Sequence, residues 1–231
     1  MGMMKFMGAC PKWTLFSLDR QVLLMRAGSV CLGTAVVLWF CGTSAFPQGR
    51  FTDVLVSVIN DKVVAVTGVG QSEVELSVGE TIVSVKGNGL TALAITSARL
   101  LGFSSQLRHW SEQPLESDEH VTSSQVIREL CVVATDQHVY GFQETLAHWT
   151  GDRLGASERV QEVRGQGHLA LVVTTERLVG FSAFISGFHA LPLEAEERIQ
   201  GIEHTGDAYL VKTSRRAVVL RSRIAGWADV N

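Results

Sequence analysis

Four cationic side chains recur at a fixed interval of 39 residues, each three residues after a threonine: Arg99, His138, Arg177 and Arg216. Guanidinium groups offer forked donors that suit carboxylates and phosphates, so this cationic column could bind an anion if a repeated structure arranged it as a ring. Alternatively, each cation flanks a turn, lies over an apolar neighbour and pairs with a local acid such as Glu176. The second interpretation is favoured, because matched positions in repeats usually preserve the geometry of the repeat.

Aromatic side chains recur at the same interval, at Trp110, Trp149, Phe188 and Trp227. If they are exposed, matched aromatic rings could stack on sugar rings. If they are buried, they anchor the core. Phe188 replaces tryptophan without breaking the interval, and this favours core packing.

The other chemistry-bearing residues give no recognisable catalytic or metal-binding pattern. His109 and His148 are equivalent in adjacent copies, which places them too far apart to share one ion at about 2 Å. The acidic segment Glu116–His120 is interpreted as a solvated loop. No nucleophile elbow, phosphate loop or dinucleotide motif occurs. The sequence therefore predicts no catalytic residues, no metal and no cofactor.

The positions of these columns imply an internal repeat of 39 residues. The copies span residues 43–81, 82–120, 121–159, 160–198 and 199–231, and the first is faint. Gly102, Gly141 and Gly180 keep the interval, and a phenylalanine follows each of them. We expect these glycines to let adjacent sheets approach closely, with the phenylalanines filling the space between them.

Each copy has the pattern of short β-strands. Residues 169–174, "LALVVT", form an apolar run of strand length, which indicates burial on both faces. Two residues separate this run from 177–183, as in a hairpin. The segment 159–165, "RVQEVRG", mixes apolar and polar residues like a partly exposed strand, and 194–202 is expected to be a loop leading into a strand. The pattern predicts about four strands per copy.

The segment "VTTERLVGFSA", residues 173–183, resembles the general β-propeller repeat of the quinoprotein and WD types. The resemblance implies an all-β body of about five four-stranded blades over residues 46–231. The chain lacks the Trp-Asp dipeptide, so no functional residue is carried over. The chain ends four residues after Trp227, which predicts that the last copy lacks its final strand.

Closure of such a ring would need a strand from the other terminus. Residues 43–50 are the candidate, although Pro47 and Gly49 make a poor strand. The ring would therefore close imperfectly, or another chain would cover its edge and form an oligomer.

The N-terminal part differs from the repeats. Residues 27–46 carry no charge, and four cations precede them against one acid. Residues 1–45 are therefore interpreted as a signal peptide, with Met25 as an alternative start, or as a retained membrane anchor. Either interpretation places the body outside the cytoplasm, periplasmic or secreted, and an uncleaved segment 27–46 would contact the membrane.

The bulk composition narrows the function classes. The chain of 231 residues is 46% hydrophobic, which suits a folded core, and its net charge of −3 makes nucleic acid a poor partner. The leading hypothesis is a non-catalytic binding or scaffold protein that recognises a protein partner. The alternatives are a carbohydrate-binding propeller and a hydrolase or lyase with a central pocket.

Overall fold

The computed structural model describes residues 53–230, which form nineteen β-strands in five antiparallel sheets and no helix. The predicted signal or anchor segment 27–46 and the predicted closing strand 43–50 lie outside the described residues. The described part belongs to one compact unit that begins at Pro47. The all-β prediction for the body is therefore confirmed for residues 53–230.

The sheets follow the repeat copies. The first sheet has three strands: β1 (Leu55–Ile59), β2 (Lys62–Thr67) and β3 (Gly70–Glu75). The second has β4 (Ile82–Asn88), β5 (Thr91–Thr96), β6 (Arg99–Ser104) and β7 (His109–Pro114). The third has β8 (Val121–Ile127), β9 (Leu130–Thr135), β10 (His138–Gln143) and β11 (His148–Arg153). The fourth has β12 (Val160–Gln166), β13 (Leu169–Thr174), β14 (Arg177–Ser182) and β15 (Phe188–Pro192). The fifth has β16 (Ile199–Thr205), β17 (Ala208–Thr213), β18 (Ala217–Arg221) and β19 (Ile224–Asp229).

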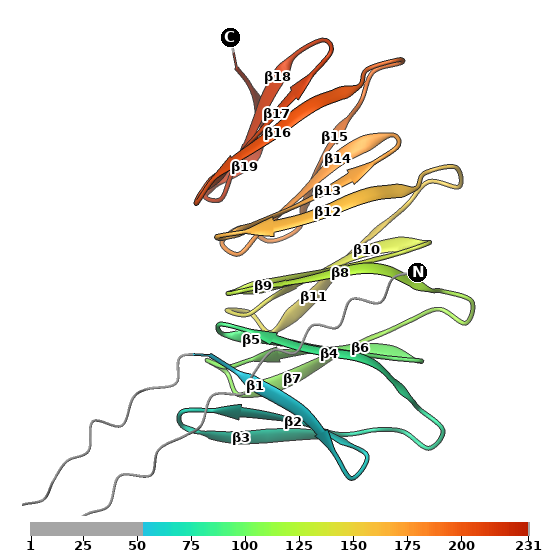
Figure 1. The fold of residues 1–231 in the computed structure, drawn as a ribbon, viewed down its shortest axis with the longest axis vertical. Coiled ribbons are helices and arrows are strands. Elements are labelled where there is room, and N and C mark those ends of the chain that lie inside the picture. Colours follow the sequence, from blue (N-terminus) through green and yellow to red (C-terminus); the bar gives the residue numbers. More distant parts are fainter. Residues whose placement is uncertain (1–52, 231) are drawn as a thin grey trace, which may run out of the picture. The chain divides into compact units, whose positions relative to one another are not determined.

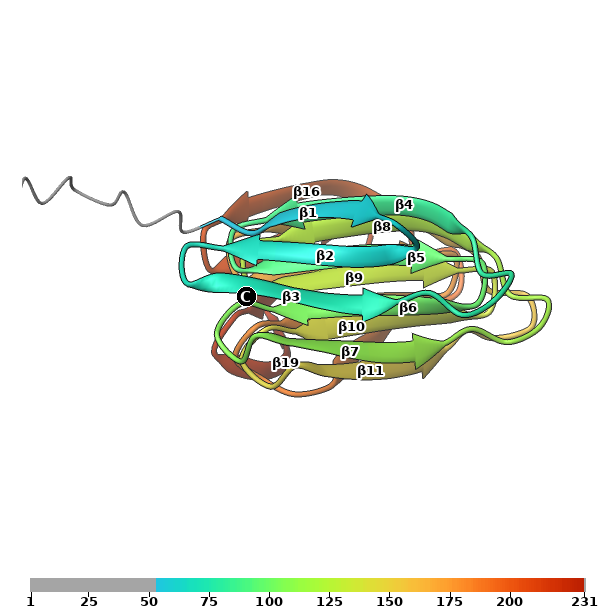
Figure 2. The ribbon, with the colours of Figure 1, turned by 90° about the horizontal axis from the view of Figure 1, so that it is seen from below.

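Each sheet packs face to face on its neighbours in the chain, so the five sheets form a row (Figure 1). Seen along this row, the first strands β4, β8 and β16 lie on one side and the last strands β7, β11 and β19 lie on the other (Figure 2). Four linkers join consecutive sheets: residues 76–81, 115–120, 154–159 and 193–198. We call the end of the sheets that carries them the linker end, and the opposite end the distal end.

The hydrophobic core fills the spaces between the sheets. Every residue of β5, β9 and β13 is buried, which confirms the prediction for the apolar run 169–174. The strand β12 is partly exposed, and β16 begins at Ile199 after a loop, both as predicted. Each of the four core clusters combines side chains from two consecutive sheets. Each interior sheet therefore contributes to two clusters, one on each of its faces.

The glycine column sets the spacing of the interior sheets. A Cβ atom on Gly102 would lie 2.6 Å from the ring of Phe142, and one on Gly141 would lie 2.5 Å from the ring of Phe181. Gly180 makes the corresponding contact with Leu220. Because real Cβ atoms do not approach so closely, only glycine fits here. The prediction that phenylalanines fill this space holds for Phe142 and Phe181, whereas Leu220 takes that place beside Gly180.

The prediction that the last copy lacks its final strand is wrong. The strand β19 pairs with β18 and places Trp227 opposite Leu220, as Trp149 lies opposite Phe142. A turn of only two residues separates β18 from β19, and this short turn leaves enough chain for the strand.

The first copy is the one that departs from the pattern. The Leu76 amide donates to the Asp61 carbonyl, and the Leu115 amide donates to the Ala98 carbonyl in the same way. The first pair encloses the hairpin of β2 and β3, which is two residues shorter than the hairpin of β6 and β7. This shortening explains why the repeat is faint in that copy. By these contacts β1, β2 and β3 correspond to β5, β6 and β7. The described residues therefore supply no counterpart of β4 in the first sheet.

The row is open between its first and fifth sheets, which lie at opposite ends of it, so the expected ring is not closed by the described residues (Figure 1). The sequence of the end faces explains this difference. Val219 occupies the position that follows Gly180 by 39 residues, and Gln71 occupies the position that precedes Trp110 by 39. At the contacts between interior sheets, one sheet supplies a glycine and the next sheet supplies an aromatic ring. The outer face of the fifth sheet therefore lacks the glycine, and the outer face of the first sheet lacks the aromatic ring.

Candidate functional site

The predicted cationic column lies at the linker end, where each member binds a glutamate of the preceding linker. Arg99 Nε lies 2.9 Å from Glu80, His138 Nδ1 3.0 Å from Glu119, Arg177 Nε 2.9 Å from Glu158 and Arg216 Nε 3.0 Å from Glu197. The four carboxylate side chains are at most 3% exposed. The column therefore connects each linker to the sheet that follows it.

Further hydrogen bonds complete this connection. The arginines of the column also donate to backbone carbonyls 24 residues earlier, on Glu75, Arg153 and Pro192. The threonine of each copy belongs to the same unit, as Thr213 shows by donating to Glu197 at 2.6 Å. The amide of Glu194 donates to the second oxygen of Glu197 at 2.8 Å. These contacts support the structural interpretation, and the anion-binding hypothesis for the column stays a prediction.

The local acid in the sequence-based interpretation was wrongly chosen. Arg177 pairs with Glu158, which lies 19 residues earlier, whereas Glu176 accepts a hydrogen bond from the Ser157 hydroxyl. The interpretation of 116–120 as a solvated loop also needs correction, because Glu119 is buried against His138. A signal was present in the sequence, since Glu80, Glu119, Glu158 and Glu197 keep the interval of 39.

Lys62 is a fifth cation that the fixed interval misses. It begins β2 as Arg99 begins β6, but it lies 37 residues before Arg99 because the first hairpin is shorter. Its ammonium group lies 2.8 Å from Glu73 and 3.1 Å from Glu75, both on β3. An alignment that allowed a two-residue gap would have found it.

Burial by itself raises the pKa of the linker glutamates, but hydrogen bonds from arginine, threonine and backbone N–H groups outweigh it. The pKa of Glu80 is lowered from 4.5 to about 2, with Arg99 as the strongest of these donors. Glu197 is likewise lowered to about 2, chiefly by Arg216. The pKa values of Glu119 and Glu158 shift in the same direction. All four carboxylates are therefore ionised at neutral pH.

These lowered pKa values predict acid-sensitive stability. A carboxylate whose folded pKa is below its unfolded pKa stabilises the fold above the unfolded value and loses this contribution as pH falls through the folded value. For Glu80 and Glu197 the window runs from 4.5 down to about 2. We expect the melting temperature to fall across this window, and Glu80→Gln to flatten the fall. A melting temperature that stays level from pH 4.5 to 2 would contradict the assignment.

The side chains of the predicted aromatic column pack between neighbouring sheets. Trp110 is 7% exposed and Trp149 is 5% exposed, while Phe188 and Trp227 are half-buried. The three indole N–H groups each donate to a carbonyl of the preceding sheet, on Ser72, Ser111 and His189. Phe188 has no such donor and packs on Phe181 with ring centroids 4.8 Å apart. The indoles therefore hold neighbouring sheets together, and no open ring face remains on Trp110 or Trp149 for a sugar.

A different polar cluster lies at the distal end. Glu144 is fully buried, and one of its oxygens accepts a hydrogen bond from the Gln106 amide at 2.8 Å. Its other oxygen has no hydrogen-bond partner among residues 53–230. Burial raises its pKa, in the direction opposite to that of the linker glutamates. Nearby, the Nδ1 atom of His168 lies 2.7 Å from a carboxylate oxygen of Glu129. Glu144 therefore costs stability as pH rises above the value at which it ionises in the unfolded chain.

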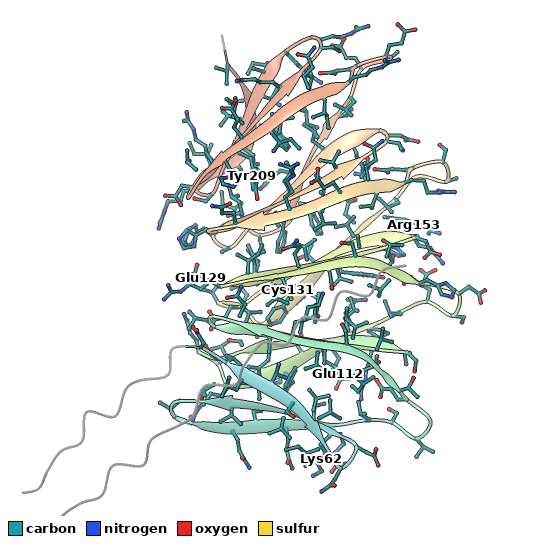
Figure 3. The ribbon with its side chains drawn as sticks, viewed as in Figure 1. Lys62, Glu112, Glu129, Cys131, Arg153 and Tyr209 are labelled. Atoms are coloured by element: carbon teal, nitrogen blue, oxygen red, sulfur yellow. The ribbon has the colours of Figure 1, made fainter. Side chains whose placement is uncertain are left out.

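Two of the hollows on the surface of the described body lie at opposite ends of the sheets. One, of about 540 Å³, lies at the linker end and is lined by Asp136, Gln137, Arg153, Leu154, Gly155, Ala156 and Arg159. We call it the third-linker hollow. The other, of about 500 Å³, lies at the distal end, where its lining includes Asn88, Arg128, Glu129 and His168. Figure 3 shows Arg153 and Glu129 at these opposite ends of the sheets.

Within residues 53–230, His, Cys, Asp and Glu side chains form no group of three or more that could hold a metal ion. His109 and His148 are both exposed. In the same range, no helix offers the length and apolar character needed to cross a membrane.

Comparison with known proteins gives similarity at the level of fold alone. No family model and no curated protein matches the sequence. The structure is similar to the N-terminal domain of Nup159 (10% identity, TM-score 0.35), covering 76% of this chain and 57% of that one. It is also similar to Prp20p from Saccharomyces cerevisiae (9%, TM-score 0.38; 72% and 54%) and to PorZ of Porphyromonas gingivalis (12%, TM-score 0.37; 77% and 26%). The chain matches little more than half of the first two and about a quarter of the third.

Proposed function

We propose that the body is a non-catalytic binding or scaffold module of the propeller type, whose linker end recognises a protein partner. One observation carries this proposal. The repeated residues of the linker end bind one another. The linkers read "ESDEH", "GASER" and "EAEER", and apart from the shared buried glutamate in fourth place their solvent-facing residues differ from copy to copy. Variable exposed loops on a rigid repeated scaffold are the common arrangement for recognition.

The geometry of the linker end supports this proposal further. Exposed residues occupy matching places in three successive linkers. Ser117 and Ala195 are equivalent positions of the repeat, and Ser157 lies one residue after the equivalent position in the linker between them. The buried glutamates at positions 119, 158 and 197 hold these linkers against the sheets. Preorganised loops lose little conformational entropy on binding, so such a surface suits a protein partner.

The alternatives have less support. The carbohydrate hypothesis rested on the aromatic column, and the indole N–H groups of Trp110, Trp149 and Trp227 bind backbone carbonyls of this chain. The hypothesis of a hydrolase or lyase needs a central pocket, whereas the two hollows described above lie at the ends of the sheets.

Site-specific photo-crosslinking of the full chain in its native cells tests the proposed function. A photoreactive residue at the exposed positions Ser117 and Ala195 samples the linker end, and one at Gln106 and Leu146 samples the distal end. We expect one discrete protein adduct from the linker-end positions and none from the distal positions. Adducts that form equally at both ends, or only at the distal end, would contradict the proposal.

We also propose that this recognition takes place outside the cytoplasm, since residues 27–46 are uncharged and follow a cationic segment. An alkaline phosphatase fusion placed after Arg50 is expected to be active. An inactive fusion would place the body in the cytoplasm.

A further inference from the structure

The third linker differs in charge from the second and fourth linkers. The second linker carries Glu116 and Asp118, and the fourth carries Glu194 and Glu196, at the positions that Gly155 and Ser157 occupy in the third. The third linker therefore lacks two acidic side chains of its neighbours, and shares this lack with the first linker, which has Ser77 and Gly79 at these positions. A hollow of about 540 Å³ lies at the third linker, and the small residues Gly155 and Ala156 form part of its lining.

The missing acids also change the charge balance. In the fourth linker Glu194 binds Arg215 at 2.6 Å. Around the third linker, the Arg153 guanidinium has no hydrogen bond or ion pair within the described residues. Arg159 donates its side-chain bonds to the carbonyls of Ala156 and Glu158 alone. Both guanidinium groups thus line the hollow without a carboxylate partner.

The acids near the hollow are already engaged, including Glu158, which binds Arg177. Asp136 accepts from the His120 amide at 2.9 Å, and this hydrogen bond lowers its pKa. Glu176 accepts from the Ser157 hydroxyl at 2.7 Å, and its other oxygen lies 3.4 Å from where a Cβ on Gly155 would be. These acids reduce the local positive potential. They leave open the guanidinium of Arg153 and, on Arg159, the Nε and the second Nη, since its other Nη donates to the carbonyls of Ala156 and Glu158.

The structural contacts of the linker end hold the hollow in shape. Arg177 binds the backbone carbonyl of Arg153 at 2.8 Å, and Glu158 accepts from the Gly155 amide at 2.9 Å. The Leu154 amide donates to the Gln137 carbonyl at 2.8 Å. The backbone around Arg153 is therefore fixed before any ligand binds, which lowers the entropic cost of binding.

We infer that the third-linker hollow binds carboxylate side chains of an extended acidic segment in the protein partner. Arginine forks match the planar carboxylate group, and a hollow of this size admits side chains rather than a single small ion. This inference rests on the proposed function, since it names the chemistry by which the linker end would recognise a protein.

Titration of a fluorescein-labelled hexaglutamate peptide with the purified full chain, followed by fluorescence anisotropy, tests the inference. We expect Arg153→Gln and Arg159→Gln each to weaken binding about three- to fivefold, as for exposed ion pairs, and added salt to weaken it as well. Ser157→Glu, which restores an acid found in the neighbouring linkers, should abolish binding. All three variants should melt at the wild-type temperature.

Controls separate this site from general charge effects. Arg128→Gln removes an exposed arginine beside the distal hollow and should leave binding unchanged. A hexalysine peptide should not bind. Equal binding by wild type and both arginine variants would overturn the inference, as would complete displacement of the peptide by inorganic phosphate at a matched concentration of negative charge. The proposed function is tested separately, because the cross-links at Ser117 and Ala195 do not depend on either arginine.

Discussion

Gly141→Val is expected to lower the free energy of unfolding by about 3 kcal/mol or more, the upper range for overpacking a core. A Cβ at this position would lie 2.5 to 2.7 Å from three ring atoms of Phe181. Phe181 is 1% exposed and packs on Phe188, so its ring has no free space into which it could move. The third and fourth sheets would have to separate. Urea unfolding of the full chain measures the loss.

Gly201→Ala is the matched control for this substitution. A Cβ on Gly201 has no atom within 4 Å, and its backbone is not in the left-handed region. We expect its effect to stay within about 0.5 kcal/mol, as for surface substitutions in general. Equal effects at the two positions would mean that glycine acts through backbone freedom rather than through the distance between sheets.

Arg177→Ala is expected to cost about 3 kcal/mol, because removing one partner of a buried ion pair leaves the other charge uncompensated. Arg177 binds Glu158, Asp152 and the Arg153 carbonyl, each at 2.8 to 2.9 Å. Glu158 is 3% exposed and would keep its charge with fewer donors around it. Denaturant unfolding at neutral pH measures the change.

Arg153→Ala is the control for that experiment, since its guanidinium makes no ion pair within the described residues and its removal should cost less than about 0.5 kcal/mol. The comparison also decides between the two interpretations of the cationic column. A stability loss at Arg177 alone supports the structural one. An Arg177→Ala protein of unchanged stability that lost an anionic ligand would support the anion-binding column instead.

Much of the fold follows from the sequence because the repeat is regular and strongly apolar. The buried run Leu169–Thr174, the glycines beside large apolar residues and the boundaries of the four later copies could all be predicted. Burial on both faces leaves a continuous apolar pattern, and a close approach of two sheets leaves a glycine. Such local signatures survive without any alignment.

The chemistry of the linker end was harder to predict. The cations were visible as a column, but each binds a linker glutamate that precedes it by 19 residues, with two strands of the chain between them. Glu176 is the acid next to Arg177 in the chain, so spacing alone suggests the wrong partner for this cation. Lys62 was missed because a hairpin two residues shorter moves it out of the interval.

The sequence by itself determined an all-β body of repeated sheets, since the spacing of apolar, glycine and aromatic residues is a property of local strands and their immediate neighbours. Only the tertiary structure decided how many strands the end sheets contain, that the row stays open, and that a hollow forms where Gly155 replaces an acid. These features depend on which groups meet across linkers and between sheets. A periodic pattern carries no information about the points at which its own regularity fails.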